Sequence, residues 1–305
     1  MNQPETARVV ATFGRHLEVR TADGSRLRAR PLGRGLSIVC GDLVRVRRDE
    51  RHEELHVTEV LPRQGALYRS TLRGAAEPVV ANLSRLLVVL APLPAPDFFI
   101  TDRYLAAATA AGIEAVLVVN KADLGAAAGI EAELEVYAQA GYPAVAVSAD
   151  SGAGLTALRA AVGGTGLAAL VGQSGVGKSS LVRALVPESQ IAVGALVREE
   201  EGRHTTTAAR LYELPGGGGL IDSPGVRDFA PAVQMLDERT LGFVEVARLA
   251  PGCRFADCRH MREPGCAVRA AAEDGQLAAR RYESYRRLRR LYEDLCAARG
   301  PQRRR

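Results

Sequence analysis

The chain has 305 residues, a formal net charge of +5 and a hydrophobic content of 47%, which is enough to build the cores of two or three domains. Its mean hydropathy is close to zero, at −0.03. No apolar run approaches the roughly 18 residues of a membrane-spanning helix, so helical spans are excluded. The N-terminal residues lack the basic and apolar regions of a secretory signal, which argues against secretion and predicts a cytoplasmic protein.

The charge is spread unevenly along the chain. Basic residues outnumber acidic ones by 12 to 9 in residues 1–64 and by 15 to 8 in residues 241–305, whereas acidic residues lead by 18 to 13 in residues 65–240. Basic ends favour contact with a polyanion such as RNA, although the same charges could simply be solvated surface. We therefore predict three domains, 1–64, 65–240 and 241–305, with the catalytic unit in the middle.

Short strand-like segments separated by turns fill residues 7–62, and Asp23-Gly24 is a strong hairpin signal. Five such strands without an intervening helix predict a small closed β-barrel. The oligonucleotide-binding (OB) fold is the first interpretation, and an SH3-like barrel is the alternative.

From Leu86 onward, apolar strands alternate with helical segments, a pattern typical of an α/β domain with a largely parallel sheet. The remainder, after residue 241, predicts short helices and one long arginine-rich helix. Within the middle domain, strands are expected at residues 86–91, 115–120, 144–149, 166–172 and 219–221, and helices at 101–112, at 130–140 and from Lys178.

Residues 172–179 read GQSGVGKS and match the P-loop pattern GxxxxGK[ST] in full, between an apolar strand and a helix. In such a loop, glycines let backbone N–H groups surround phosphate oxygens. Lys178 is expected to contact the β- and γ-phosphates, and the Ser179 hydroxyl to ligate Mg²⁺. The predicted phosphate-binding residues are Gly172, Gln173, Ser174, Gly175, Val176, Gly177, Lys178, Ser179 and Ser180.

The motif Asn120-Lys121-Ala122-Asp123, at the end of an apolar strand, indicates which nucleotide base is bound. The Asp123 carboxylate can accept hydrogen bonds from guanine N1–H and the 2-amino group, a donor pair that adenine lacks. Asn120 is expected to tie this loop to its surroundings, and the stem of Lys121 to lie along the base. Ser148-Ala149 resembles the short loop whose backbone donates to the guanine keto group. The predicted ligand is therefore GTP or GDP.

The motif Asp222-Ser-Pro-Gly225 follows the apolar strand expected at residues 219–221. We expect Asp222 to hold Mg²⁺ through water and the Gly225 N–H to sense the γ-phosphate. The next residue, Val226, stands where many GTPases carry a water-positioning glutamine. Because its side chain cannot orient water, slow intrinsic hydrolysis is expected.

The segment 202–207, GRHTTT, lies between the P-loop and this motif. A threonine from it is expected on Mg²⁺ when the γ-phosphate is present, Thr206 in our interpretation and Thr205 as the alternative. His204 is a candidate for the missing water-positioning group; the alternative is an ordinary exposed loop histidine.

Four residues of metal-binding types fall within fourteen positions near the C-terminus: Cys253, Cys258, His260 and Cys266. In a reducing compartment such clustering favours a metal over disulfides. Three thiolates and one imidazole form a closed tetrahedral set, which predicts one structural Zn²⁺.

The helix expected over residues 277–292 has leucines spaced to bury one face. We expect its arginines to remain available to RNA phosphates and, because the DSPG motif lies upstream, γ-phosphate loss to shift this region. These arginines are Arg280, Arg281, Arg286, Arg287, Arg289 and Arg290.

The order of the motifs is circularly permuted, since NKAD and SA precede the P-loop, GRHTTT and DSPG, and the cysteine cluster comes last. Together with RHTTTAARLY and EPGCAV, this order resembles the ribosome small-subunit-dependent GTPase A family of bacteria. The resemblance implies an OB domain, a permuted α/β P-loop GTPase domain and an α-helical zinc domain. It also implies hydrolysis stimulated by the small ribosomal subunit and a late role in maturing that subunit.

We accordingly expect a GTP hydrolase that binds the small ribosomal subunit and its rRNA, acts as a monomer, has no membrane partner, and uses GTP, Mg²⁺ and one Zn²⁺. Two other interpretations stay open from the residues alone. One is a GTPase that serves a non-ribosomal partner. The other is an RNA-binding module that uses GTP only as a structural ligand.

Overall fold

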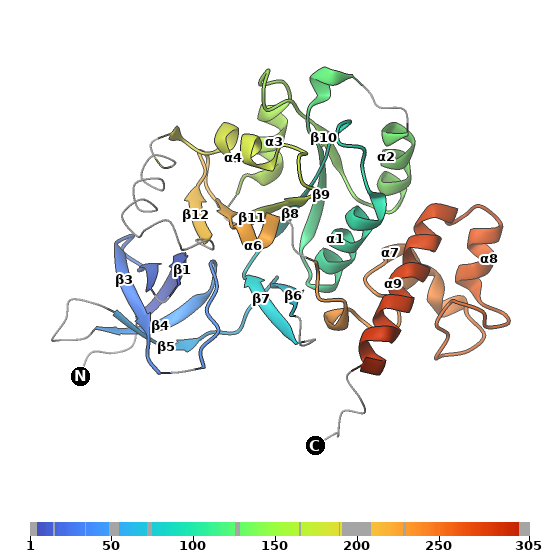
Figure 1. Cartoon of the computed structure of the whole chain (residues 1–305), viewed down its shortest axis with the longest axis horizontal. Coiled ribbons are helices and arrows are strands. Elements are labelled where there is room, and N and C mark those ends of the chain that lie inside the picture. Colours follow the sequence, from blue (N-terminus) through green and yellow to red (C-terminus); the bar gives the residue numbers. More distant parts are fainter. Residues whose placement is uncertain are drawn as a thin grey trace.

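The computed structural model describes residues 5–14, 16–33, 35–48, 55–71, 75–125, 129–164, 166–188, 190, 209–227 and 230–298. Figure 1 shows a β-barrel at the N-terminus, an α/β sheet in the centre and a helical region on the far side of that sheet. Residues 230–298 are called the C-terminal unit below. Within the described ranges, no helix combines the length and apolarity that crossing a membrane requires.

The N-terminal barrel contains the five predicted strands, which the structure confirms. Strand β1 pairs with both β2 and β4, and β3 pairs in parallel with β5, so the order β1-β2-β3-β5-β4 closes on itself. This closed Greek-key arrangement is that of an OB-type barrel rather than an SH3-like one. Alternate side chains such as Val9, Val19, Val44 and Val57 fill the interior. The bounds are β1 Glu5–Phe13, β2 His16–Arg20, β3 Arg26–Pro31, β4 Leu43–Arg48 and β5 Leu55–Val60.

The central sheet has the predicted α/β form. Its strands run in the order β10-β9-β8-β11-β13-β12, and all but β12 are parallel to their neighbours. The strands are β8 Arg85–Leu90, β9 Glu114–Val119, β10 Ala144–Ala146, β11 Leu167–Gly172, β12 Ala209–Glu213 and β13 Gly219–Asp222. The helices are α1 Phe98–Ala110, α2 Ile130–Gln139, α3 Leu155–Val162 and α4 Lys178–Leu185, with a 3-10 turn η1 at Ala122–Leu124.

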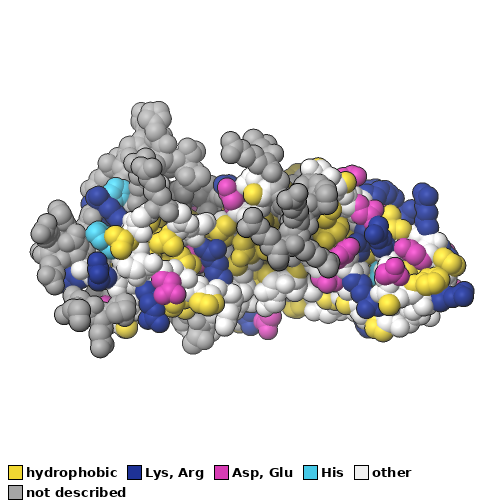
Figure 2. Space-filling view, turned by 90° about the horizontal axis from the view of Figure 1, so that it is seen from below, with side chains coloured by type: hydrophobic (Ala, Val, Ile, Leu, Met, Phe, Trp, Pro, Cys, Tyr) yellow, Lys and Arg dark blue, Asp and Glu magenta, His cyan; other side chains and the backbone are white. Residues whose placement is uncertain are grey.

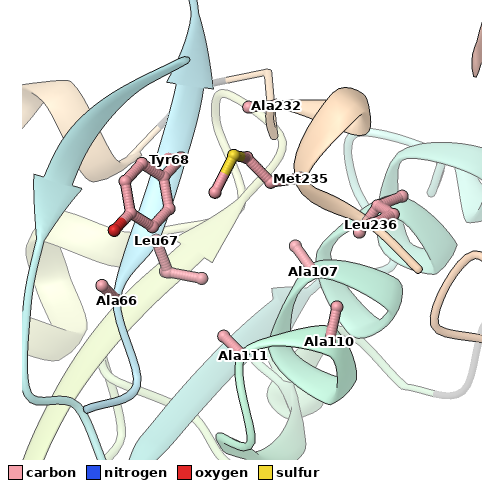
Figure 3. A pocket seen from close by; sticks show the side chains of 9 residues that line it. All are labelled: Ala66, Leu67, Tyr68, Ala107, Ala110, Ala111, Ala232, Met235 and Leu236. Atoms are coloured by element: carbon pink, nitrogen blue, oxygen red, sulfur yellow. The ribbon is translucent and has the colours of Figure 1, made fainter. Parts of the chain in front are cut away.

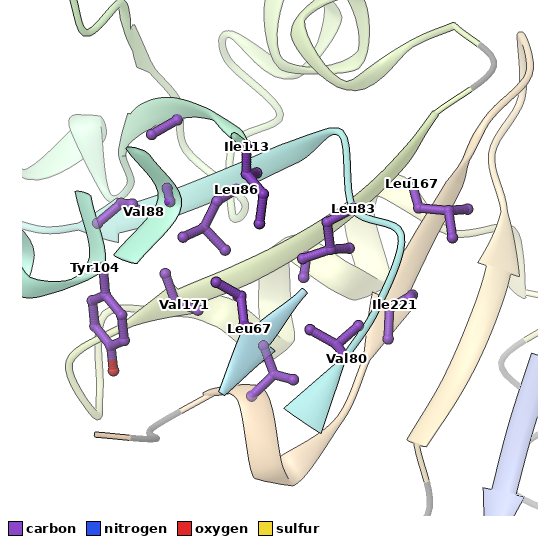
Figure 4. Close-up of a cluster of buried hydrophobic side chains, with 14 of the residues drawn as sticks. Leu67, Val80, Leu83, Leu86, Val88, Tyr104, Ile113, Leu167, Val171 and Ile221 are labelled. Atoms are coloured by element: carbon purple, nitrogen blue, oxygen red, sulfur yellow. The ribbon is translucent and has the colours of Figure 1, made fainter. Parts of the chain in front are cut away.

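Successive residues of β8 point to opposite faces of this sheet, as the pleat requires. Val88 belongs to the core under α1 and α2, which includes Leu105 and Tyr137. Val89 belongs to the core under α3 and α4, with Leu158 and others. Figure 4 shows the first core, in which Leu86, Val88 and Val171 of the sheet lie beside Tyr104 of α1 and Leu67 and Val80 of a hairpin.

Two elements were not predicted from the sequence. The hairpin of β6, Leu67–Ser70, and β7, Ala76–Val80, follows the barrel and packs beneath the central sheet. Strand β12 pairs with β1 of the barrel, so barrel and central strands form one sheet of eleven strands. At this joint the buried Arg210 lies over the ring of Phe13, 5.6 Å from its centroid. The division at residues 64 and 240 stays a prediction, because one sheet joins the first two parts.

The C-terminal unit is helical, as predicted, and its long helix α9 spans Ala279–Ala298. The expectation for its arginines was wrong in part, since Arg281 and Arg289 are each only 1% exposed and Arg280 is held in ion pairs. Acidic residues and carbonyl groups on other elements draw these three side chains inward, which the helix sequence alone does not reveal. The other elements here are η2 Val233–Met235, α7 Val244–Leu249, η3 Ala250–Gly252 and α8 Ala267–Glu273, and α6 Pro224–Arg227 precedes the unit.

A buried ionic hub, formed by Asp102, Glu245, Arg280 and Arg281, attaches α9 to the central domain. Arg281 donates to Asp102 at 2.7 Å and twice to Glu245, at 2.7 Å each. Arg280 donates to the other Asp102 oxygen at 2.6 Å and to Glu133 of α2 at 2.5 Å. Both charges of the Asp102–Arg281 pair are almost completely buried, so each depends on the other for compensation.

Replacing Asp102 with Ala should therefore lower the thermal midpoint by roughly 6–20 °C, because breaking a buried ion pair costs about 3–5 kcal/mol and a chain of this size loses about 2–4 °C per kcal/mol. Circular dichroism melting measures this. Arg69→Ala is the control, because its pair with Glu77 is half exposed (49% and 51%) and should shift the midpoint by less than about 3 °C. Equal shifts in the two variants would contradict the role of the hub.

Candidate nucleotide and metal sites

The predicted nucleotide motifs all lie at the carboxyl ends of neighbouring parallel strands. Asn120 follows β9, Gly172 ends β11, and Asp222 ends β13, while Ser148 lies two residues after the end of β10. Because β10, β9, β8, β11 and β13 are adjacent in that order, their ends form one edge of the sheet. Open α/β sheets bind ligands at this edge.

The predicted P-loop connects β11 to α4 and depends on its glycines. Gly175 and Gly177 have φ of 84° and 93°, values that side chains rarely adopt. A Cβ at Gly177 would lie 2.3 Å from the Asn120 amide nitrogen, so only glycine allows this contact. Lys178 is 6% exposed, and its ammonium donates to the carbonyls of Gly172 and Gln173 at 2.7 and 2.8 Å. The ammonium thus lies over the loop.

Asn120 joins three loops that are far apart in the sequence. Its Nδ2 donates to the Val176 carbonyl of the P-loop at 2.9 Å, and its Oδ1 accepts from the Ala149 N–H at 3.1 Å. Lys121 adds a second link, because its ammonium donates to the carbonyls of Gly175 and Leu93, both at 2.8 Å. The Asn120–Asp123 loop, which is predicted to read the base, the P-loop and the Ser148-Ala149 loop are therefore held in one arrangement.

A cavity of about 230 Å³ opens between these loops. Asp123, the residue predicted to read the base, lines it. Its other lining residues are Asn120, Lys121, Leu124, Ser148, Ala149, Asp150, Gly177 and Ser180.

A different cavity, of about 100 Å³, lies between β6, α1 and η2. Figure 3 shows that small apolar side chains such as Ala107 and Ala110 line it, with Met235 and Tyr68 opposite. None of the predicted site residues takes part, so the cavity is unrelated to the nucleotide motifs.

Asp222 is 7% exposed at the end of β13, next to the P-loop strand β11. The Gly225 N–H donates to the Ser223 hydroxyl at 3.2 Å. Val226 is completely buried and packs in the core beneath the sheet with Val79 and Val80. A side chain at this position therefore points into the core.

Three predicted residues of the switch segment fall outside the described residues, which resume at 209. They are His204, Thr205 and Thr206. Their roles stay predictions.

The structure brings the four predicted metal ligands together, with one ligand atom of each within 4.8 Å of the others. His260 Nδ1 lies 3.4 Å from the Cys253 sulfur and 3.6 Å from the Cys266 sulfur, and those two sulfurs are 4.0 Å apart. A tetrahedral zinc site has S–S edges of about 3.8 Å and S–N edges of about 3.5 Å, from bond lengths of ~2.3 and ~2.0 Å. The four residues therefore fit this metal.

Burial disfavours the charged forms of two of these ligands. Burial lowers the pKa of His260 to about 4, so the imidazole is neutral at pH 7, as a ligand must be. Burial raises the pKa of Cys258 to about 12, because a thiolate in this site needs a compensating positive charge. The Tyr282 hydroxyl donates to the His260 carbonyl at 2.8 Å, and this bond attaches the ligand loop to α9.

Sequence reasoning missed the contacts between the P-loop and the segment before α1. The Asp97 N–H donates to the Gln173 side-chain oxygen at 3.1 Å, and the Leu93 carbonyl accepts from Lys121 at 2.8 Å. Neither Asp97 nor Leu93 belongs to a recognisable motif. No signal in the sequence points to them.

Comparison with known proteins gives consistent matches. A family described as RsgA GTPase matches residues 60–231. The small ribosomal subunit biogenesis GTPase RsgA of Pseudomonas aeruginosa is 45% identical over 288 residues, covering 93% of this chain and 84% of that protein. The protein of the same name from Azotobacter vinelandii is 44% identical and covers 92% and 83%.

Solved structures match over nearly the whole chain. YjeQ from Thermotoga maritima aligns with a TM-score of 0.71 and 27% identity, covering 98% of this chain and 100% of that one. YloQ, a circularly permuted GTPase, aligns with a TM-score of 0.72 and 23% identity, covering 99% and 98%. The second match bears on the fold alone, and the permuted fold predicted from the motif order is confirmed.

Purified protein should hold about one zinc ion per chain, because four ligands at tetrahedral spacing form a closed structural site. Cys258→Ser should lose the metal and loosen the C-terminal unit. Cys296→Ser, which changes an exposed cysteine on α9, should keep it. Metal analysis measures the zinc content of both variants. Equal zinc contents in the two variants would exclude the site, and so would a well-folded C-terminal unit without metal.

Proposed function

This chain belongs to the RsgA GTPase family, and from that premise we propose that it hydrolyses GTP to GDP and phosphate and assists late maturation of the small ribosomal subunit. We also propose that the subunit stimulates the hydrolysis. Its relatives are named for small ribosomal subunit biogenesis. The observation that carries the proposal is the buried Asn120 amide, which fixes the guanine-reading loops against the P-loop.

In this proposal the Asp123 carboxylate selects guanine and the backbone N–H groups of residues 173–178 hold the phosphates. The Lys178 ammonium exchanges its two loop carbonyls for the β- and γ-phosphates. Ser179 and Asp222 would hold Mg²⁺, together with Thr206 or Thr205. Bound magnesium supplies positive charge against the transferring phosphoryl group.

Stimulation by a partner follows from the position of Val226. Its side chain is buried in the core, so the residue after the DSPG motif cannot orient the attacking water. His204 is the proposed water-positioning group, and docking on the subunit would bring it into place. A slow intrinsic rate and a fast stimulated rate are the consequence.

Binding to ribosomal RNA is supported by arginines at both ends of the molecule. In Figure 2, basic side chains lie over the barrel and the C-terminal unit, with acidic side chains interleaved on the latter. Exposed arginines along the barrel include Arg28, Arg30 and Arg47, and such side chains can neutralise phosphates. The proposed Zn²⁺ holds the loops of the C-terminal unit together and takes no part in hydrolysis.

The deciding experiment is a GTPase assay with and without purified small ribosomal subunits. We expect turnover to rise by at least about tenfold with subunits, because docking would bring into place the water-positioning group that the Val226 side chain cannot provide. Lys178→Ala should be inactive in both conditions. Unchanged turnover with subunits would favour a GTPase for another partner, and bound GTP without any turnover would favour a module that uses GTP as a structural ligand.

A further inference from the structure

The segment before helix α1 is attached to the nucleotide loops at three points. The Asp97 N–H donates to Gln173 at 3.1 Å, and Lys121 links the Leu93 carbonyl to that of Gly175. Pro94 packs against the same glycine, since a Cβ at Gly175 would lie 3.3 Å from its ring. Residues 92–97 therefore move with the P-loop and the base-reading loop.

Helix α1 begins directly after these contacts. Asp97 is its N-cap, and the Asp97 carboxylate accepts from the backbone N–H groups of Phe99 and Ile100 at 2.9 and 3.2 Å. Asp102, at the buried ionic hub, lies five residues further on, about 7.5 Å along the helix axis at ~1.5 Å per residue. A helix is stiff over this length, so a displacement at Asp97 reaches Asp102.

The side chains of the buried ionic hub have little room to adjust if Asp102 is displaced. Asp102 and Arg281 are each 1% exposed, and Asp102 also accepts from the Tyr137 hydroxyl at 2.7 Å. The Arg280 guanidinium lies 5.2 Å from the centroid of the Phe98 ring in the first turn of α1. Because interiors of this kind change between discrete arrangements, a shift of α1 must carry the start of α9 with it.

We propose that residues 92–102 are a mechanical link between the nucleotide site and the C-terminal unit. Gln173 is the positioning residue at the nucleotide end, and Asp102 is the positioning residue at the other end. Guanine nucleotide and any partner of the C-terminal unit then alter each other's affinity by the same factor. The proposed link extends the proposed function. It rests on that function in one respect, that the bound ligand is a guanine nucleotide.

This route differs from the one expected from the sequence, which runs from the DSPG motif directly into the C-terminal region. It passes through α1 and depends only on described residues. Two observations carry it independently, the P-loop contacts of residues 92–97 and the ion pairs of Asp102 with both Arg280 and Arg281.

The first test follows hydrogen exchange in the full-length, metal-loaded protein, with and without saturating GDP. In the wild type, GDP should slow exchange of amides in residues 279–290 by at least about threefold. Gln173→Leu removes the side-chain acceptor, one of the three attachments, and should weaken this response at full GDP occupancy. Gln173→Glu keeps an acceptor oxygen and should restore it. A wild-type response in Gln173→Leu, or no response in the wild type, would overturn the link.

The reciprocal test measures GDP affinity in two matched variants of α9. Arg280→Gln removes the pairs with Asp102 and Glu133 and should raise the Kd for GDP by about fivefold or more. Arg290→Gln makes the same charge change on the same helix, but its contact with Glu283 is 3.9 Å long and half exposed, so the Kd should stay within about twofold. Equal effects of the two variants would contradict the proposal.

Zinc content and thermal melting show whether each variant is folded. If Arg280→Gln is not folded, the comparison of Gln173→Leu with Gln173→Glu tests the link. No ribosomal subunit is present in either test. Failure of the link is therefore distinct from failure of the proposed function, which would appear as absent GDP binding or absent stimulation by subunits.

Discussion

The nucleotide site depends on one buried side chain, the amide of Asn120. It is 1% exposed and satisfies a P-loop carbonyl and an N–H of the Ser148-Ala149 loop together. Buried polar groups without partners cost about 1–3 kcal/mol each, so loss of the amide would weaken the arrangement of these loops and leave Lys121 as the remaining link between the Asn120–Asp123 loop and the P-loop. The separation between the phosphate-binding and base-reading groups is set by this contact.

The sheet topology explains why a permuted motif order still brings the same motifs together. Position in the sheet, not order in the chain, decides which strand ends are neighbours, and β9 and β11 flank β8 here. The permutation has a structural consequence, since the chain leaves the DSPG motif directly for the C-terminal unit. Strand β12, which follows the switch segment in the chain, is the strand of the central sheet to which the barrel is joined.

Local patterns allowed much of this to be predicted from the sequence. Strands β1 to β5, the parallel sheet, the P-loop and the cysteine–histidine set each depend on residue types at short spacing. The joint of β1 with β12 depends on pairing between Ala11 and Arg210, far apart in the chain, and no local signal marks it. The burial of Arg281 and Arg289 could not be predicted for the same reason, because their partners, an acidic side chain and backbone carbonyls, are distant in the chain.

The most direct test of this account is the GDP affinity of Asn120→Ala. Loss of two buried hydrogen bonds should raise the Kd by at least about tenfold, with the fold retained. Asn82→Ala is the matched control, because that amide also bridges two loops, donating to the Gly41 carbonyl and accepting from the Gln64 N–H, but at the barrel joint. The account predicts a near wild-type Kd for Asn82→Ala. A Kd for Asn120→Ala within about twofold of wild type would contradict it.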